Sequence, residues 1–187
     1  MPTVECDVAE ARERLEDAGV TVSEGRGDAT AVAYDGKVVI QGSNPADLEA
    51  LLRERGGRAH VYFDGAARGN PGPAAVGYVV VTGDGIVAEG GERVGRATNN
   101  QAEYEALTRA LEVARDYGFE EVDVRGDSEL IVKQVRGEYD ANDPQLREHR
   151  VTVRELLTAF ESWSLEHVPR EINGRADELA NDALDDA

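Results

Sequence analysis

The order of elements between residues 58 and 187 is the feature that most limits the possible folds. Three strand-like runs punctuated by glycine come first, at residues 60–66, 74–83 and 86–95. Helical and strand-like segments then alternate: helices are predicted over 99–117, 128–137, 144–160 and 174–186, and strands over 120–127 and 162–168. Strands followed by strand–helix alternation predict an α/β fold with a mixed sheet covered by helices.

The first 56 residues show a different pattern of expected helices and strands, which predicts a separate, small α+β domain. Its expected elements are two helices, over residues 5–18 and 45–56, and a hairpin that turns at Asp35–Gly36. The two strands of the hairpin are expected over residues 30–36 and 37–42. Gly56–Gly57 is the predicted boundary. We therefore expect a domain over residues 1–56 and a larger one over residues 58–187.

Apolar runs and cysteine usage limit where the protein works. No apolar run approaches the roughly 20 residues that span a membrane, and the N-terminus lacks the apolar core of a signal peptide. We therefore expect a cytoplasmic protein without a membrane partner. The single cysteine, Cys6, can form no internal disulfide and argues against a cysteine-rich zinc site.

The charge balance opposes nucleic-acid binding under ordinary conditions. The chain has 38 acidic and 20 basic residues, for a net charge of -18, and its only lysines are Lys37 and Lys133. Basic groups usually provide affinity for nucleic acid by displacing counterions from phosphate. At molar salt, however, the Debye length falls to about 3 Å, so repulsion is screened. The composition therefore indicates either a halophile's cytosol or a protein that avoids nucleic acid.

An aspartate lies in the middle of the first strand-like run. Alternation places Val61 and Phe63 on one face of that strand, and the other face holds His60, Tyr62 and Asp64. Because helices must cover the sheet, we expect Asp64 to lie in a partly covered layer. An unpaired carboxylate there costs several kcal/mol or has a raised pKa, so a compensating group is expected nearby.

Three other acidic residues occupy comparable positions. Glu103 stands four residues before Leu107 on the apolar stripe of a predicted helix. Asp127 ends a strand directly before a helix, where parallel strands expose ligand-binding groups. Asp177 lies in the first turn of the last helix. Taken alone, Glu103 is equally well explained as a carboxylate that the helix dipole favours, and Asp127 as an ordinary turn residue. For Asp177 alone, stabilisation by the helix dipole is the better explanation.

Together, the four carboxylates share one explanation, which is convergence on hard cations. Magnesium prefers oxygen ligands and keeps several of its waters. Two such ions about 3.5 to 4 Å apart activate a water and stabilise the leaving oxygen in phosphoryl displacement. The acidic residues therefore predict a metal site that acts on phosphate.

Four segments, in this order and spacing, resemble the signature blocks of type 1 ribonuclease H: FDGAARGNPGPAAVGYVV, TNNQAEYEAL, VRGDSELIVKQVRGEY and HVPREINGRADELAN. The resemblance covers residues 58–187 and implies the ribonuclease H fold, a five-stranded mixed sheet in strand order 3-2-1-4-5 with helices on both faces. It also implies endonucleolytic hydrolysis of the RNA strand of RNA/DNA hybrids. Such cleavage leaves 5′-phosphate and 3′-hydroxyl ends, and it serves the removal of RNA primers and R-loops.

By the same resemblance, the acidic residues match the family's catalytic tetrad, which would hold two Mg²⁺ or Mn²⁺ ions. Asp64 and Asp127 match the central metal ligands. Glu103 completes the shell of one ion and contacts the RNA, and Asp177 holds the metal beside the nucleophilic water. The resemblance thus implies the metal ligands Asp64, Glu103, Asp127 and Asp177.

The resemblance also implies a set of substrate contacts. Asn70, Asn99, Asn100 and Glu103 match positions that touch the minor groove of the hybrid, where 2′-hydroxyls distinguish RNA from DNA. Ser128, next to Asp127, is a further expected contact and the expected helix cap. Asn99 or Asn100 is expected to cap the helix over 99–117.

Two histidines compete for a supporting role in catalysis. His167 lies ten residues before Asp177, where many family members carry a mobile histidine that assists water activation or product release. The alternative is that His167 is a structural residue at the end of a strand, hydrogen-bonded to backbone. His149 is a weaker candidate for the catalytic role. Trp163 alternates with Leu165 on one strand, which predicts core packing rather than base stacking.

Three departures distinguish the chain from well-known family members. Glu129 replaces the glutamine of bacterial members at a substrate-contacting position, and residues 137–150 are too short and too neutral for a basic protrusion, as in the archaeal-like branch. Residues 1–56 lack the aromatic-rich hybrid-binding domain of eukaryotic members. Instead, residues 30–52 resemble the domain that precedes type 3 ribonuclease H, which would help bind substrate. A packing or solubility appendage is the alternative.

Two classes of function follow. The leading interpretation is a monomeric, metal-dependent endoribonuclease that acts on RNA/DNA hybrids, with RNA/RNA duplexes as a further candidate substrate. The rival is a catalytically silent nucleic-acid-binding module, because fold does not determine function. The presence of all four carboxylates favours the enzyme.

Overall fold

The computed structural model describes residues 57–186 without a gap, and before them residues 3–5, 13, 22–23, 31–34 and 37–40. The chain divides into two compact units, the second of which begins at residue 56. The predicted substrate-binding role of the first unit stays a prediction.

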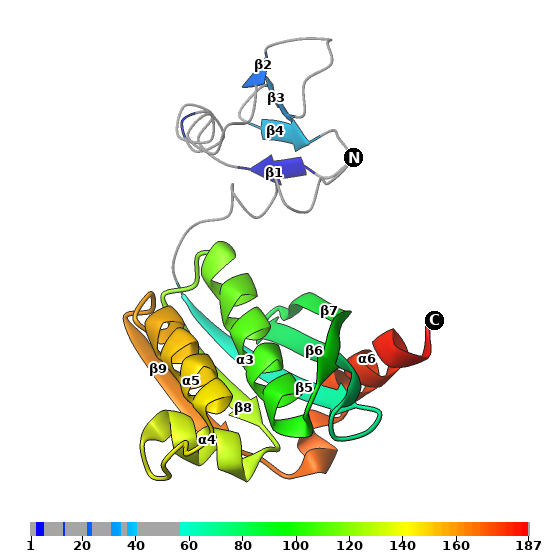
Figure 1. The fold of residues 1–187 in the computed structure, drawn as a ribbon. Coiled ribbons are helices and arrows are strands. Elements are labelled where there is room, and N and C mark those ends of the chain that lie inside the picture. The colour runs from blue at the N-terminus through cyan, green and yellow to red at the C-terminus, as the bar shows by residue number, and fades with distance from the viewer. Residues whose placement is uncertain are drawn as a thin grey trace. The chain divides into compact units, whose positions relative to one another are not determined.

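The first unit contains a four-stranded sheet of order β1-β4-β3-β2 (Figure 1). Its strands are β1 (Thr3–Glu5), β2 (Val22–Ser23), β3 (Ala31–Tyr34) and β4 (Lys37–Ile40). β3 and β4 pair antiparallel with Tyr34 opposite Lys37, which confirms the predicted hairpin. β1 pairs with β4 through Glu5, so the predicted helix over 5–18 is wrong at its first residue. The rest of that helix, except helical residue 13, and the helix over 45–56 lie outside the described residues.

The second unit is built on a five-stranded sheet of order β7-β6-β5-β8-β9, which in the numbering of this unit is the predicted order 3-2-1-4-5. Its strands are β5 (Arg58–Ala67), β6 (Gly72–Thr82), β7 (Gly85–Ala97), β8 (Glu121–Gly126) and β9 (Ser162–His167). β5, β6 and β7 form an antiparallel meander, whereas β8 and β9 run parallel to β5. The mixed sheet is therefore confirmed.

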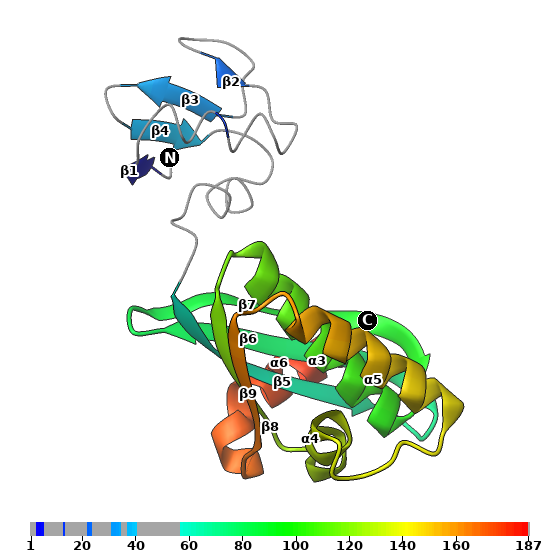
Figure 2. The same ribbon diagram turned by 90° about the vertical axis from the view of Figure 1, so that its left-hand side faces the viewer.

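Helices cover both faces of this sheet, as predicted (Figures 1 and 2). They are α3 (Asn99–Asp116), α4 (Glu129–Arg136), α5 (Pro144–Leu157), a short 3-10 helix (Arg170–Asn173) and α6 (Gly174–Asp185). α6 packs on β5, β6 and β7, and α3 lies on the opposite face. In the described part of the chain, no helix has the length and apolarity needed to cross a membrane.

The core forms where the apolar face of β5 meets α3. Val61 and Phe63 are fully buried, and so are Leu107 and Leu111 of α3. Burial contributes about 1.5–3 kcal/mol for each large apolar side chain and stabilises the packing of α3 on the sheet. The buried face of α3 therefore fixes the position of Glu103 relative to the sheet.

Two helix ends differ from the prediction. Thr98, rather than Asn99 or Asn100, caps α3: its Oγ1 accepts from the N–H of Gln101 at 3.2 Å, and Gln101 Oε1 accepts from the N–H of Thr98 at 2.9 Å. This reciprocal pair is a capping box. α5 ends at Leu157 rather than at residue 160, because the N–H groups of residues 158–160 bond three residues back in a tight turn that leads into β9.

Candidate active site

Four elements of the second unit carry acidic side chains to one cavity. Asp64 lies in the second half of β5, and Asp127 directly follows the last residue of β8. Glu103 lies beyond the first turn of α3, which holds no acidic residue, so the helix dipole does not explain it. Asp177 lies in the first turn of α6. All four side chains line the same cavity.

Three of these carboxylates are close enough to share a ligand. Asp64, Glu103 and Asp127 each offer an oxygen, and these oxygens lie within 4.8 Å of one another. Asp177 comes close because Gly77, opposite Asp64 on β6, lets α6 approach the sheet. A Cβ built on Gly77 would lie 2.1 Å from the carbonyl oxygen of Ala176. Strand pairing and small residues therefore bring the four carboxylates to one cavity.

Buried carboxylates dominate the electrostatics of the cavity. Asp64 is only 4% exposed, and burial, followed by the charges of Glu103, Asp127 and Asp177, raises its pKa to about 10. Burial and the charge of Asp127 raise the pKa of Glu103 to about 8. Glu103 Oε2 is buried without a hydrogen-bond partner. A divalent cation would supply both the missing charge and the missing partner, so these residues fit a metal.

Three polar residues also line the cavity, although sequence reasoning assigned them no role: Arg68, Arg170 and Asn181. Arg170 Nη2 lies 3.2 Å from Asp177 Oδ1. Arg68 and Arg170 both stand inside the quoted signature blocks. Basic residues are few in this acidic chain, so two of them close in sequence to the acidic residues of the site could have indicated a role. Nothing in the local pattern pointed to Asn181, because helical spacing alone does not show that a polar residue faces a cavity.

One of the predicted substrate contacts lines the same cavity, and a second is hydrogen-bonded to the first. Asn99 lines the cavity, and Asn70 Oδ1 accepts from the N–H of Asn99 at 3.1 Å. Asn100 follows Asn99 and is half-buried. Ser128 occupies the N-cap of α4, but its hydroxyl makes no capping hydrogen bond. Contact of these four residues with substrate stays a prediction.

The two histidines lie in different places. His167 is the last residue of β9 and pairs in register with Gly126, the residue before Asp127. His149 instead stacks on Tyr104 with ring centroids 5.7 Å apart, and it lines a separate cavity. Among the described residues that line the carboxylate cavity there is neither histidine. His167 is nevertheless the histidine beside the strand end that carries Asp127.

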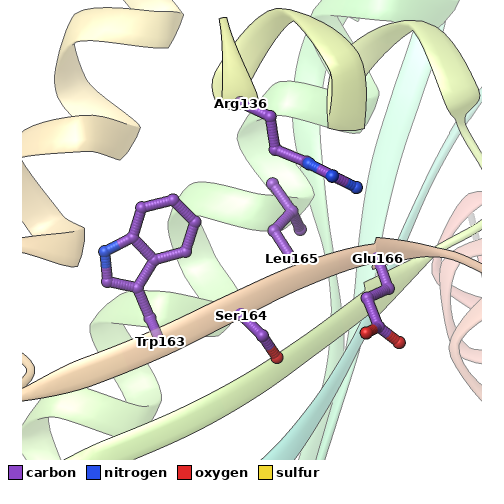
Figure 3. Close-up of a pocket in the computed structure, with 5 residues that line it drawn as sticks. All are labelled: Arg136, Trp163, Ser164, Leu165 and Glu166. Atoms are coloured by element: carbon purple, nitrogen blue, oxygen red, sulfur yellow. The ribbon is translucent and has the colours of Figure 1, made fainter. Parts of the chain in front are cut away.

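The prediction that Trp163 packs in the core is wrong. Trp163 is 42% exposed, whereas Leu165 on the same face of β9 is 4% exposed. β9 is the edge strand of the sheet, so this face is covered at Leu165 and left open at Trp163. Figure 3 shows Trp163, Leu165 and Arg136 around the shallow pocket that results.

Comparison with known proteins agrees with this geometry. The family model described as "Reverse transcriptase-like" matches residues 62–183. Ribonuclease HI of Halobacterium salinarum is 59% identical over an alignment of 199 residues that covers 100% of both chains. A crystal structure of RNase H1 from the same halophilic archaeon is 67% identical over 70% of this chain and 100% of that one, with a TM-score of 0.69.

A second solved structure contains nucleic acid. It is the compost-derived LC11-RNase H1 in complex with an RNA/DNA hybrid, and it is 42% identical over 68% of this chain and 97% of that one, with a TM-score of 0.65. The full-length match to a ribonuclease HI and the confirmed strand order lead to the same assignment. The chain belongs to the type 1 ribonuclease H family and is a hydrolase of that family.

Proposed function

We propose that this protein cleaves the RNA strand of RNA/DNA hybrids endonucleolytically, leaving 5′-phosphate and 3′-hydroxyl ends. The observation that carries the proposal is the meeting of Asp64, Glu103 and Asp127 oxygens within 4.8 Å in an open cavity. The hybrid bound to the similar LC11 protein supports the choice of substrate.

Asp64, Glu103, Asp127 and Asp177 would hold two divalent cations, Mg²⁺ or Mn²⁺. When bound, such ions lower the pKa of water and stabilise charge on the attacking and leaving oxygens. The raised pKa values of Asp64 and Glu103 mean that both carboxyls release protons when they take up the metal charge.

Residues around the tetrad bind and orient the nucleic acid in this proposal. The Asn70 amide is held by the N–H of Asn99, and Thr98 rather than an asparagine caps α3. The amides of Asn99 and Asn100 are therefore not used for capping, and with Asn70 and the Ser128 hydroxyl they would read the 2′-hydroxyls of the minor groove. His167 would move a proton near Asp127, through an imidazole nitrogen.

The cellular setting completes the proposal. Hybrid cleavage would serve removal of RNA primers and R-loops in the cytoplasm of a halophile, by a monomer whose first unit adds substrate affinity. The acidic composition and the similarity to a protein of Halobacterium salinarum support the halophilic setting. Activity on RNA/RNA duplexes is a further candidate.

A panel of labelled duplexes tests the proposal. RNA/DNA, RNA/RNA and DNA/DNA 12-mers of one sequence are incubated in high KCl with Mg²⁺ or Mn²⁺, and the products are resolved by strand. We expect cleavage of the RNA strand of the hybrid, no cleavage of DNA, and no cleavage when divalent ions are chelated. Binding of the hybrid by folded protein without cleavage would identify a catalytically silent module instead.

A further inference from the structure

We propose that Arg68 is a phosphate-binding residue of this site, held in place by Asn181 and Asp185 of α6 until the nucleic-acid backbone arrives. The inference rests on the proposed function and adds to it a residue that contacts the substrate strand outside the tetrad. Arg68 lies in the loop between β5 and β6, four residues after Asp64, and lines the carboxylate cavity.

The guanidinium group of Arg68 has two partners on one stripe of α6. Nη1 donates to Asn181 Oδ1 at 3.2 Å, and Nη2 lies 2.9 Å from Asp185 Oδ1. Asn181 in turn donates from Nδ2 to the backbone carbonyl of Asp177 at 2.9 Å. Asp177, Asn181 and Asp185 are four residues apart and so lie along one side of the helix. The arginine is thereby positioned beside the metal-binding end of α6.

The negative charge of the molecule makes each cation at the contact surface important for binding nucleic acid. A chain of net charge -18 repels a polyanion, so cations at the contact surface must provide the attraction. Among the described residues that line the cavity, the basic ones are Arg68 and Arg170. Arg170 pairs with Asp177, a member of the tetrad, whereas Asp185, the ion-pair partner of Arg68, is outside the tetrad.

The ion pair of Arg68 is one that a phosphate can replace. Its side chain is 52% exposed and that of Asp185 is 66% exposed, and exposed pairs contribute little to stability. A guanidinium binds phosphate through two parallel N–H groups, which is a stronger arrangement than a single contact to an exposed carboxylate. The backbone of Arg68 is fixed by its N–H bond to the carbonyl of Pro73 at 2.8 Å, so only the side chain has to move.

A purely structural role makes the opposite prediction for Asp185. If Arg68 only ties the loop to α6, Asp185→Asn and Arg68→Gln weaken the same tie and both impair the protein. If Arg68 binds phosphate, Asp185 competes with the substrate, and Asp185→Asn strengthens binding. Asp182→Asn removes the same charge from the same helix and controls for the general loss of repulsion.

The test measures binding of a fluorescein-labelled 12-mer hybrid by anisotropy, with divalent ions chelated, over a range of KCl in which circular dichroism shows folded protein. For Arg68→Gln we expect a Kd about threefold or more above wild type at the lowest salt, and a slope of log Kd against log [KCl] reduced by about 0.7 to 0.9, the loss of one phosphate contact. Arg58→Gln is the matched control: Arg58 is also 52% exposed, pairs with Glu121 and Asp123, and lies at the other end of β5.

Cleavage is measured on the same proteins with metal present. We expect kcat at saturating hybrid to stay within about twofold of wild type for Arg68→Gln. The lost phosphate contact is made equally in the bound ground state and in the transition state, so its loss weakens binding without slowing the chemical step. An unchanged Kd and salt slope for Arg68→Gln, or an Asp185→Asn variant that binds more weakly than Asp182→Asn, would overturn the assignment of Arg68. Absence of cleavage by wild type would overturn the proposed function alone, because the binding slopes do not depend on turnover.

Discussion

Gly65, the residue after Asp64, lies directly against Ala102, the residue before Glu103. A Cβ built on Gly65 would lie 2.2 Å from the carbonyl carbon of Ala102 and 2.3 Å from the backbone nitrogen of Glu103. The backbone N–H of Gly65 also donates to the Glu103 carboxylate. The missing side chain at position 65 therefore sets the separation of β5 and α3, and with it the meeting of two carboxylates of the site.

We predict that Gly65→Ala damages both the site and the fold. The added methyl group must push α3 away from β5, which costs about 1–3 kcal/mol of unfolding free energy, as overpacked cores do. We expect the displacement of Glu103 to lower kcat by about a hundredfold, the size of loss that a misplacement of about 1 Å can cause. Gly83→Ala is the control, because no atom lies within 4 Å of its Cβ position. Equal kcat and equal urea midpoints in the two variants would contradict this reading.

The raised pKa values of Asp64 and Glu103 predict a protein that loses stability as pH rises without metal. The folded carboxyls keep their protons up to about pH 10 and 8 respectively, whereas the unfolded ones lose them near their ordinary values of 3.8 and 4.5. The unfolded state thus binds fewer protons across this window, and the unfolding free energy falls with pH. Thermal unfolding with EDTA should give a lower Tm at pH 9 than at pH 6, and Mg²⁺ should raise Tm more at pH 9.

Asp64→Asn is the control for the pH prediction. The amide removes the buried carboxyl that titrates, so the Tm of the variant with EDTA should change less between pH 6 and pH 9 than that of wild type. The Mg²⁺-dependent rise in Tm should shrink as well, because a ligand is lost. A wild-type Tm that is the same at both pH values would contradict the raised pKa values.

Much of the fold followed from periodicity, and the exceptions have physical reasons. Alternation along β5 placed Asp64 opposite the face of Val61 and Phe63, because a strand's faces are determined by its pleat alone. The α3 cap was misjudged because Thr98 and asparagine are both good caps, and only the reciprocal bond with Gln101 decides between them. Burial of Trp163 depended on which strand forms the edge of the sheet, which strand pairing settles and alternation does not.

The carboxylates of the site were predictable for a different reason. Glu103, Asp127 and Asp177 each have an ordinary explanation when taken alone, but together with Asp64, and within the signature blocks, they indicate a metal site. Arg68 stands in a signature block, but nothing in the sequence indicated its contact with Asn181, because that contact depends on how α6 packs against the loop after β5. Local sequence patterns do not predict contacts between residues that are far apart in the sequence.

We predict that His167→Ala lowers kcat on the order of a hundredfold, the low end of the effect of a positioned proton-transfer group, with little change in KM. His167 lies beside the strand end that carries Asp127. His149→Ala should instead lower stability, because His149 stacks on the buried Tyr104. His60→Ala, a change at the far end of β5 near Asp123, should leave kcat unchanged. A kcat that depends on His149 and not on His167 would reverse the assignment.

The acidic composition predicts dependence on salt. With 38 acidic and 20 basic residues, repulsion destabilises the compact state wherever the Debye length is long, and molar salt shortens it to about 3 Å. We expect circular dichroism to show loss of folded structure on dialysis to low salt and its recovery with KCl or divalent ions. Equal stability at low and molar KCl would count against a halophilic origin.

The most direct test of the central claim compares wild type with Asp127→Asn on a 12-mer hybrid labelled on the RNA strand, in high KCl with Mg²⁺ or Mn²⁺. We expect metal-dependent cleavage of the RNA strand by wild type and a loss of at least about a thousandfold in the variant, since the metal supplies several kcal/mol of transition-state stabilisation. Binding of the hybrid should persist in the variant, because Asp127 contributes no cation to the contact. Cleavage by Asp127→Asn at the wild-type rate would mean that the carboxylate cluster is not the catalytic site.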